Sequence, residues 1–249
     1  MVEMIIQPYD RSPIDPMVAS AARQELYQRE CLRRILDPRT GPLYWLQHHT
    51  KTEDPHWVEA GATSPNRPFP DMPYFQPLID QWLTEPIIFV EKSRDMMVSW
   101  LFIGLYTWVC QVRPGTEVLV QSQKEKKAWN LVGYARTLYK NQDPWLKRMF
   151  PLVTRLSSQS KDMIAWGNNS VMYGIPEGAD QIRSHHPWAL FGDEAAFQPK
   201  AGEAYNASIS ACEHITMVSS ANQGWFCNVV TGMESIFGLQ AIQDQMRIQ

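Results

Sequence analysis

The stretch from Glu85 to Cys110 constrains the fold most, because it combines a short apolar run, a polar turn and a long apolar run. Pro86 to Val90 is rich in β-branched and aromatic residues, which predicts a buried strand. Residues 96–110 are almost entirely apolar, and such a helix is either buried in a core or crosses a membrane. Because the run is shorter than the roughly 18 residues that a bilayer requires, the sequence predicts a buried helix.

The polar turn at residues 91–95 lies where a phosphate-binding loop would lie, because the free N–H groups at a helix start attract anions. Its match to the pattern G-x-x-x-x-G-K-[ST] is poor. Aligned on Ser99, the two glycines become Lys92 and Met97, and the lysine becomes Val98. Only the magnesium-binding hydroxyl of Ser99 is retained. Taken alone, the stretch is therefore typical of an ordinary strand, loop and helix in an α/β core.

Composition places the chain among globular proteins. Its 249 residues suffice for one α/β domain with a sizeable core. The net charge of −3 gives no global basic field of the kind that favours nucleic acid. The four cysteines lack the spacing of a metal site, and the first residues lack the features of a signal peptide. A cytoplasmic protein fits these features.

Further elements are expected on both sides of the apolar stretch. A helix is predicted over residues 15–36, followed by an irregular, proline-rich arm over residues 50–73. Residues 77–83 favour a short helix, and residues 123–140 a longer one whose start is rich in lysine. Strands are predicted at 116–122 and 214–220, and a β-hairpin at 163–166 and 171–175.

Two acids follow another short apolar strand, predicted at residues 188–192. Asp193 and Glu194 are adjacent, and buried carboxylates are costly without a cation or a metal. Asp193 is a candidate ligand of Mg²⁺, and Glu194 a candidate for polarising an attacking water. The alternative is a strand that simply runs out into an acidic turn.

Tyr74, Phe75 and Gln76 precede the phosphate-loop stretch. The Gln76 amide can both donate to and accept from an adenine edge, and an aromatic ring can stack on a base. The simpler interpretation is a surface glutamine beside a hydrophobic anchor.

Taken together, these stretches resemble the ATPase domain of the large terminase subunits of tailed bacteriophages, over about residues 70–230. The stretches occur in the order found in that family: FQPLIDQW, KSRDMMVSW, LVQSQKEKKA, GADQIRSHHPWALFGDEAAF and MVSSANQGWF. The resemblance implies an α/β fold, a P-loop NTPase core of the ASCE type, with a mainly parallel sheet flanked by helices on both faces. Residues 1–73 would pack on this core as a helix and an irregular arm, residues 74–225 would form it, and residues 226–249 would begin a lid or linker.

The resemblance also assigns roles to individual residues. Gln76 would read adenine, Lys92 would replace the missing lysine, and Arg94 would stabilise charge on the γ-phosphate. Ser99 and Asp193 would hold Mg²⁺, and Glu194 would be the catalytic carboxylate. The remaining candidates are Ser93 and Arg183 for phosphate binding, with Arg183 as a phosphate sensor, and Ser219, Ser220 and Asn222 for coupling hydrolysis to movement.

The function implied is a motor that hydrolyses ATP, with Mg²⁺, to move double-stranded DNA into a viral shell in the cytoplasm of the infected host. Its expected partners are the DNA, the portal protein, the small terminase subunit and further copies in a five-membered ring. A nuclease is not expected, because the residues after Trp225 contain just two acids, Glu234 and Asp244. Met97 stands where relatives commonly keep glycine, so its side chain is expected to crowd the bound phosphates.

Two alternative functions remain at this stage. One is a helicase-type DNA-dependent ATPase, which would need further helicase motifs and a second ATPase-like lobe. The other is a nucleotide-binding scaffold with little hydrolysis, which the missing lysine and Met97 favour and the Asp193–Glu194 pair opposes.

Overall fold

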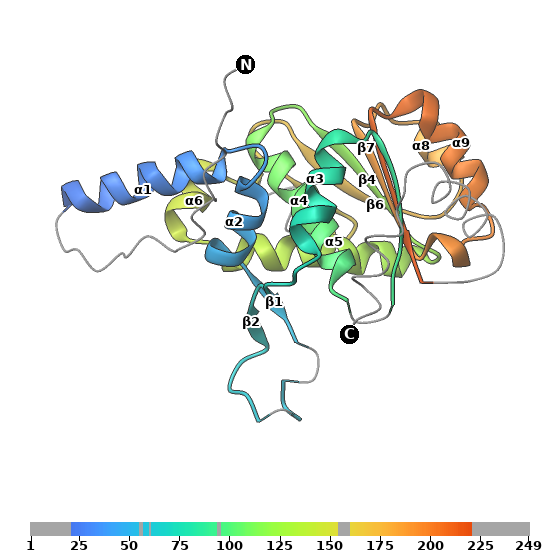
Figure 1. Cartoon of the computed structure of the whole chain (residues 1–249). Helices are drawn as coiled ribbons and strands as arrows, with labels where there is room; N and C mark the ends of the chain where they lie inside the picture. The colour runs from blue at the N-terminus through green and yellow to red at the C-terminus, as the bar shows by residue number, and fades with distance from the viewer. Residues whose placement is uncertain (1–20, 55–56, 60, 94–95, 154–159, 221–249) are drawn as a thin grey trace, which may run out of the picture.

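A computed structural model describes residues 21–54, 57–59, 61–93, 96–153 and 160–220 (Figure 1). The helical segments are α1 (Ala21–Ile35), α2 (Gly41–His49), α3 (Phe75–Thr84), α4 (Val98–Val112), α5 (Glu125–Asn141), α6 (Pro144–Met149), α8 (Asp180–Arg183), the 3₁₀ turn η1 (Ala195–Phe197) and α9 (Ala201–Ala211). The strands are β1 (Lys51–Glu53), β2 (Asn66–Pro68), β3 (Ile87–Glu91), β4 (Glu117–Gln121), β5 (Met163–Ala165), β6 (Val171–Ile175), β7 (Ala189–Asp193) and β8 (His214–Ser219).

The centre of the described structure is a six-stranded sheet in the order β3-β8-β7-β4-β6-β5. All neighbouring strands run parallel except β5, which pairs antiparallel with β6. Strand β8 lies between β3, which leads into the polar turn, and β7, which carries the acids. Because these strands are parallel, the polar turn, the acids and the serines at the end of β8 all lie at one edge of the sheet.

Helices cover both faces of the sheet, as Figure 1 shows. Side chains alternate along each strand, so Val90 and Val120 pack with α4 and α5 on one face. Phe89 and Leu119 pack with α8 and α9 on the other. The predicted class, an α/β core with a mainly parallel sheet between helices, is therefore confirmed.

Helix α4 is buried on every side, as its sequence predicts. Leu101, Phe102 and Ile103 are all fully inaccessible to solvent. The sheet covers one side of α4, and α2 lies so close to another that a Cβ on Gly104 would sit 2.6 Å from Leu46 Cδ2. Among the described helices, none is long and apolar enough to cross a membrane.

The arm before the core is more regular than its sequence predicts. Residues 15–20 lie outside the described ranges, and the described helix covers Ala21–Ile35. Residues 50–73 were expected to be irregular, but β1 and β2 pair antiparallel within them, with Glu53 opposite Asn66. Helix α3 begins at Phe75, ahead of Pro77, because a proline in the first turn removes no helical hydrogen bond.

Candidate active site

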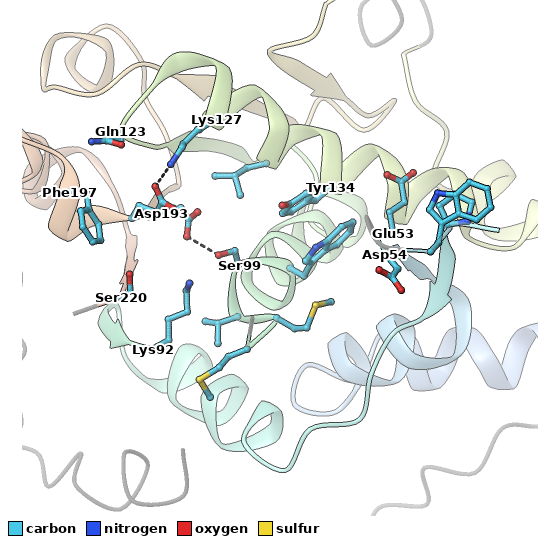
Figure 2. Close-up of a pocket in the computed structure, with 18 residues that line it drawn as sticks. Glu53, Asp54, Lys92, Ser99, Gln123, Lys127, Tyr134, Asp193, Phe197 and Ser220 are labelled. Carbon is cyan, nitrogen blue, oxygen red and sulfur yellow. Dashed lines mark hydrogen bonds and ion pairs between the residues drawn. The ribbon is translucent and has the colours of Figure 1, made fainter. Parts of the chain in front are cut away.

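The predicted phosphate turn and the predicted acids meet at the carboxyl edge of the sheet. The Ser99 hydroxyl, in the first turn of α4, donates a hydrogen bond of 2.8 Å to Asp193 Oδ1 at the end of β7 (Figure 2). Burial raises the pKa of Asp193, although the Ser99 bond and the charge of Lys92 lower it. A buried carboxylate held beside a hydroxyl at the start of a helix is a ready acceptor for a cation.

Both acids of the pair line the same cleft, although successive residues of a strand point to opposite faces. The backbone provides the reason: Glu194 has a φ of 52°, in the left-handed region, so the chain turns directly after Asp193. The Gln198 amide then donates to the Asp193 carbonyl oxygen at 2.8 Å, which stabilises this turn. A non-glycine residue with positive φ is uncommon and is typical of functional sites.

Glu194 is held by a cation from the next element. Lys127 Nζ, in the first turn of α5, lies 2.5 Å from Glu194 Oε2. The sequence shows only that the start of α5 is rich in lysine, and it does not predict this contact. The available signal is topological: β4 is parallel to β7, so the start of α5 and Glu194 must emerge at one edge.

Ser219, the last residue of β8, contacts both halves of the site. Lys92 N donates to the Ser219 carbonyl oxygen at 2.9 Å, at the start of the phosphate turn. The Ser219 hydroxyl accepts a hydrogen bond of 3.1 Å from Ala196 N, two residues after Glu194. Ser219 is fully buried, whereas Ser220 lines the cleft. The end of β8 therefore contacts both halves of the site.

Met97 is the residue at which the turn becomes helix α4, and its backbone supports the comparison with glycine. It has a φ of 55°, a conformation that glycine adopts far more readily than methionine. Tyr74, which directly precedes α3, anchors this segment, because its hydroxyl donates to the Met96 carbonyl oxygen at 3.0 Å.

The structure does not bring every predicted site residue to the cleft. Gln76 Nε2 donates to Asp80 Oδ1 at 2.9 Å and to the Arg39 carbonyl oxygen, outside the cleft lining. Arg183 is exposed on α8 beside Asp180, at 3.4 Å. Ser93 is exposed and does not line the cleft. Arg94 and Asn222 lie outside the described residues.

The cleft has a volume of about 850 Å³, which is within the range of small-molecule sites. The end beside the predicted phosphate turn, which we call the phosphate end, is lined by Lys92, Ser99, Asp193, Glu194, Lys127, Gln123 and Ser220. The other end of the cleft reaches the β1–β2 hairpin, at Glu53, Asp54, Trp57 and Pro65, and the middle is apolar and aromatic.

The donor set fits Mg²⁺ bound together with a phosphate ligand. The described ranges contain no group of three or more His, Cys, Asp or Glu residues that would hold a metal alone. Mg²⁺ is usually bound through one or two carboxylates, with phosphate oxygens and waters completing its shell. Ser99 Oγ and Asp193 Oδ1, 2.8 Å apart, provide a hydroxyl and a carboxylate for such a shell.

Comparison with solved structures places this geometry in a known fold. The HK97 bacteriophage large terminase superposes on 82% of this chain with a TM-score of 0.57 and 13% identity. The chain has the fold of a phage large terminase. Other large terminases match with lower scores: an ATPase-domain mutant from Thermus phage P74-26 covers 72% of this chain and 74% of its own (TM-score 0.45, 12% identity). The large terminase of a thermophilic bacteriophage, in complex with ADP, covers 55% of this chain and 34% of its own (TM-score 0.34, 14% identity).

The likeness to the HK97 terminase is one of fold, because so few residues are identical. The chain spans 42% of the length of that terminase. No protein-family model matches the sequence, and no curated protein matches it.

Proposed function

We propose that this chain is the ATPase motor domain of a phage large terminase, which couples ATP hydrolysis to the movement of double-stranded DNA into a procapsid. The observation that carries the proposal is the meeting of Ser99 with Asp193 at the edge of the sheet, with Glu194 in the same cleft. This pairing joins the start of the helix after a phosphate turn to an acidic strand, as phosphoryl transfer requires. The terminase fold supports the same assignment.

Each residue at the phosphate end has a distinct role in the proposed reaction. Lys92 contacts the β- and γ-phosphates, and its charge takes the place of the lysine missing from the turn. Ser99 and Asp193 would hold Mg²⁺, which would neutralise charge on the phosphate oxygens. Glu194 orients a water in line with the γ-phosphate and accepts its proton as the water oxygen bonds to phosphorus and the bond to ADP breaks.

Ser219 is the proposed link between hydrolysis and movement. It contacts the start of the phosphate turn through its carbonyl oxygen and the segment after Glu194 through its hydroxyl. Loss of the γ-phosphate changes the forces on both segments, and β8 receives both changes. Ser220 and Asn222 follow β8 and complete the proposed coupling segment.

The proposed partners follow from this function. Contacts to duplex DNA would be mostly with phosphates, so that affinity falls steeply with salt and varies little with sequence. The portal protein, the small terminase subunit and a ring of five copies complete the proposed machine. Arg94 would stabilise the charge that develops on the γ-phosphate.

The substitution Glu194→Gln tests the hydrolytic role. It should leave Mg²⁺-dependent ATP binding near the wild-type value and lower turnover by about a hundredfold or more, because the amide cannot accept a proton. Glu203→Gln, an equivalent change at an exposed position on α9, is the matched control and should retain full turnover. Equal turnover in the wild type and Glu194→Gln would remove Glu194 from the mechanism. Wild-type ATP binding without turnover, in the presence of portal and DNA, would favour the scaffold.

A further inference from the structure

The cleft extends well beyond the phosphate end, and its far part is not explained by phosphate binding. Tyr134 lies between Ser99 and the acidic residues of the hairpin in Figure 2. It stacks on Trp100, with ring centroids 3.9 Å apart and ring planes inclined by 9°. Both rings line the cleft, and Trp100 directly follows Ser99 in α4. An aromatic wall therefore begins beside the magnesium ligand and leads away from the phosphates.

The residues predicted to hold the base are engaged elsewhere. Tyr74 and Phe75 are 2% and 0% exposed, so neither offers a ring face to a ligand. The Gln76 amide donates to Asp80 and to the Arg39 carbonyl oxygen. None of the three lines the cleft, which reaches the β1–β2 hairpin instead.

The hairpin has a fixed position at the far end of the cleft. Asn141 in α5 donates to Asn66 Oδ1 at 3.1 Å, which ties β2 to the helix that carries Tyr134. Thr52 is 3% exposed, so β1 is packed against the body of the protein. The Glu53 carboxylate, which follows Thr52, is exposed and lines the cleft.

The two ends of the cleft differ in the part of a nucleotide that they suit. Lys92 and Lys127 lie at one end together with Asp193, the proposed Mg²⁺ ligand, and Glu194, whereas Glu53 and Asp54 lie at the other end, where Arg67 pairs with Asp54 at 3.4 Å. A polyphosphate placed against the Glu53 carboxylate would be repelled, whereas ribose hydroxyls and base amino groups are donors that a carboxylate accepts. Aromatic side chains and an apolar middle suit the faces of a base.

We infer that the nucleoside end of the bound nucleotide lies in the hairpin half of the cleft, against the Trp100–Tyr134 wall, with Glu53 accepting hydrogen bonds from its donors. This inference rests on the proposed function, because it needs the triphosphate at the Ser99–Asp193 end. It assigns nucleoside recognition to the hairpin and α5 rather than to Gln76. The ligand class is a purine nucleoside triphosphate.

Two ligands separate nucleoside recognition from phosphate binding: Mg²⁺–ATP and Mg²⁺–tripolyphosphate, which has no nucleoside. Calorimetry should show that Tyr134→Leu weakens ATP binding about tenfold, since base stacking contributes on the order of 1–3 kcal/mol. Glu53→Gln, at an exposed position of β1, should weaken ATP binding about threefold. Tyr134→Leu and Glu53→Gln should leave the affinity for tripolyphosphate unchanged. The control Glu203→Gln should bind both ATP and tripolyphosphate as the wild type does.

The alternatives give different results. A selective loss of ATP affinity in Gln76→Ala, with Glu53→Gln and Tyr134→Leu unchanged, would overturn the inference and return the base to Gln76. Equal losses for ATP and tripolyphosphate in Glu53→Gln and Tyr134→Leu would also overturn it. If the wild-type protein binds tripolyphosphate as tightly as ATP, the nucleoside contributes no affinity, which overturns this inference but leaves the proposed function standing. A wild-type protein that binds neither ligand would overturn the proposed function together with this inference.

Discussion

At the scale of single residues, the site holds two side chains in left-handed backbone, Met97 and Glu194. The conformation costs a residue with a Cβ about 1–2 kcal/mol, and glycine avoids this cost. We predict that Met97→Gly is more stable than Met97→Ala by about 1 kcal/mol. Both variants lose the packing of the methionine side chain, so the difference between them reports the backbone alone.

Urea unfolding of the two Met97 variants measures this difference. The different helix propensities of glycine and alanine do not contribute to this difference, because Met97 precedes the first helical residue of α4. An alanine variant at least as stable as the glycine variant would show that the left-handed backbone is not costly. The Met97→Gly variant should also bind Mg²⁺–ATP more tightly than Met97→Ala, since a bound phosphate requires the same left-handed backbone at residue 97.

A second residue-scale prediction concerns Lys127, which positions Glu194. The side chains of Lys127 and Glu194 are 46% and 36% exposed, and exposed ion pairs contribute at most about 1 kcal/mol to stability. Lys127→Met should therefore change the free energy of unfolding by less than about 1 kcal/mol. Its turnover should fall about tenfold, because the carboxylate is no longer held in place.

The matched control is Lys126→Met, at an exposed position that does not line the cleft. It should keep wild-type turnover, and Lys127→Arg should recover part of the lost turnover because it restores the charge. If Lys127→Met hydrolysed ATP at the wild-type rate, the ion pair would have no positioning role.

At the scale of elements, the sequence predicts the central strands well and the covering helices less well. The predicted bounds of β3, β4, β7 and β8 agree with the structure within a residue or two, because short apolar runs between turn residues are typical of buried strands. Helix α2 was missed because it starts with Gly41-Pro42, a pair that usually indicates a turn, although proline is well tolerated in a first helical turn. Helix α9 was missed because its small residues give little helical periodicity.

The same division applies to the candidate site. Ser99 and Asp193 could be paired from sequence, because parallel strands bring their carboxyl ends to one edge. The contacts of Lys127 and Glu53 could not, because they depend on how α5 and the hairpin lie across the sheet. The motif around Gln76 lies outside the cleft lining, and its neighbours Tyr74 and Phe75 are buried in the core. That Gln76 reads adenine stays a prediction.

One contact between elements makes a pH-dependent contribution to stability. His49, at the end of α2 and 4% exposed, lies 2.7 Å from Asp143 Oδ2, at the start of α6. Burial lowers the pKa of His49, but the bond to Asp143, with a smaller contribution from Cys31, outweighs it and leaves the pKa raised. Because the pKa of His49 is higher in the folded protein than its unfolded value near 6.5, protonated His49 stabilises the fold fully only below that pH. This contribution is lost as the pH rises through the pKa of the folded state.

The free energy of unfolding should therefore decrease from about pH 6 upward, as His49 loses its proton. Asp143→Asn should be less stable than its parent by on the order of 1 kcal/mol at about pH 6, and the two should converge at higher pH. Urea titrations of both proteins, in a Cys31→Ala background that removes the thiol, measure the difference. A constant difference across this pH range would contradict the ion pair.

At the scale of the whole molecule, the charge at the phosphate end of the cleft bears on whether neighbouring copies of the chain are needed for turnover. Of the described residues that line the cleft, Lys92 and Lys127 carry the positive charges, and Lys127 is already paired with Glu194. A triphosphate carries more negative charge than one lysine and Mg²⁺ neutralise, and phosphoryl transfer uses a further arginine that comes either from the same chain, as proposed for Arg94, or from a neighbouring molecule. We therefore predict that turnover per subunit rises with protein concentration, as neighbouring copies complete the sites.

Mixing wild type with Glu194→Gln at constant total concentration tests the ring independently of the concentration series. Independent subunits would lose turnover in proportion to the inactive fraction, so an equal mixture would keep half of the activity. In a ring whose members act in succession, one inactive copy halts its neighbours, and an equal mixture should retain far less than half. A linear decline, together with turnover per subunit that does not depend on concentration, would show that each chain hydrolyses ATP alone. The further positive charge would then come from within the chain, with Arg94 as the first residue to substitute.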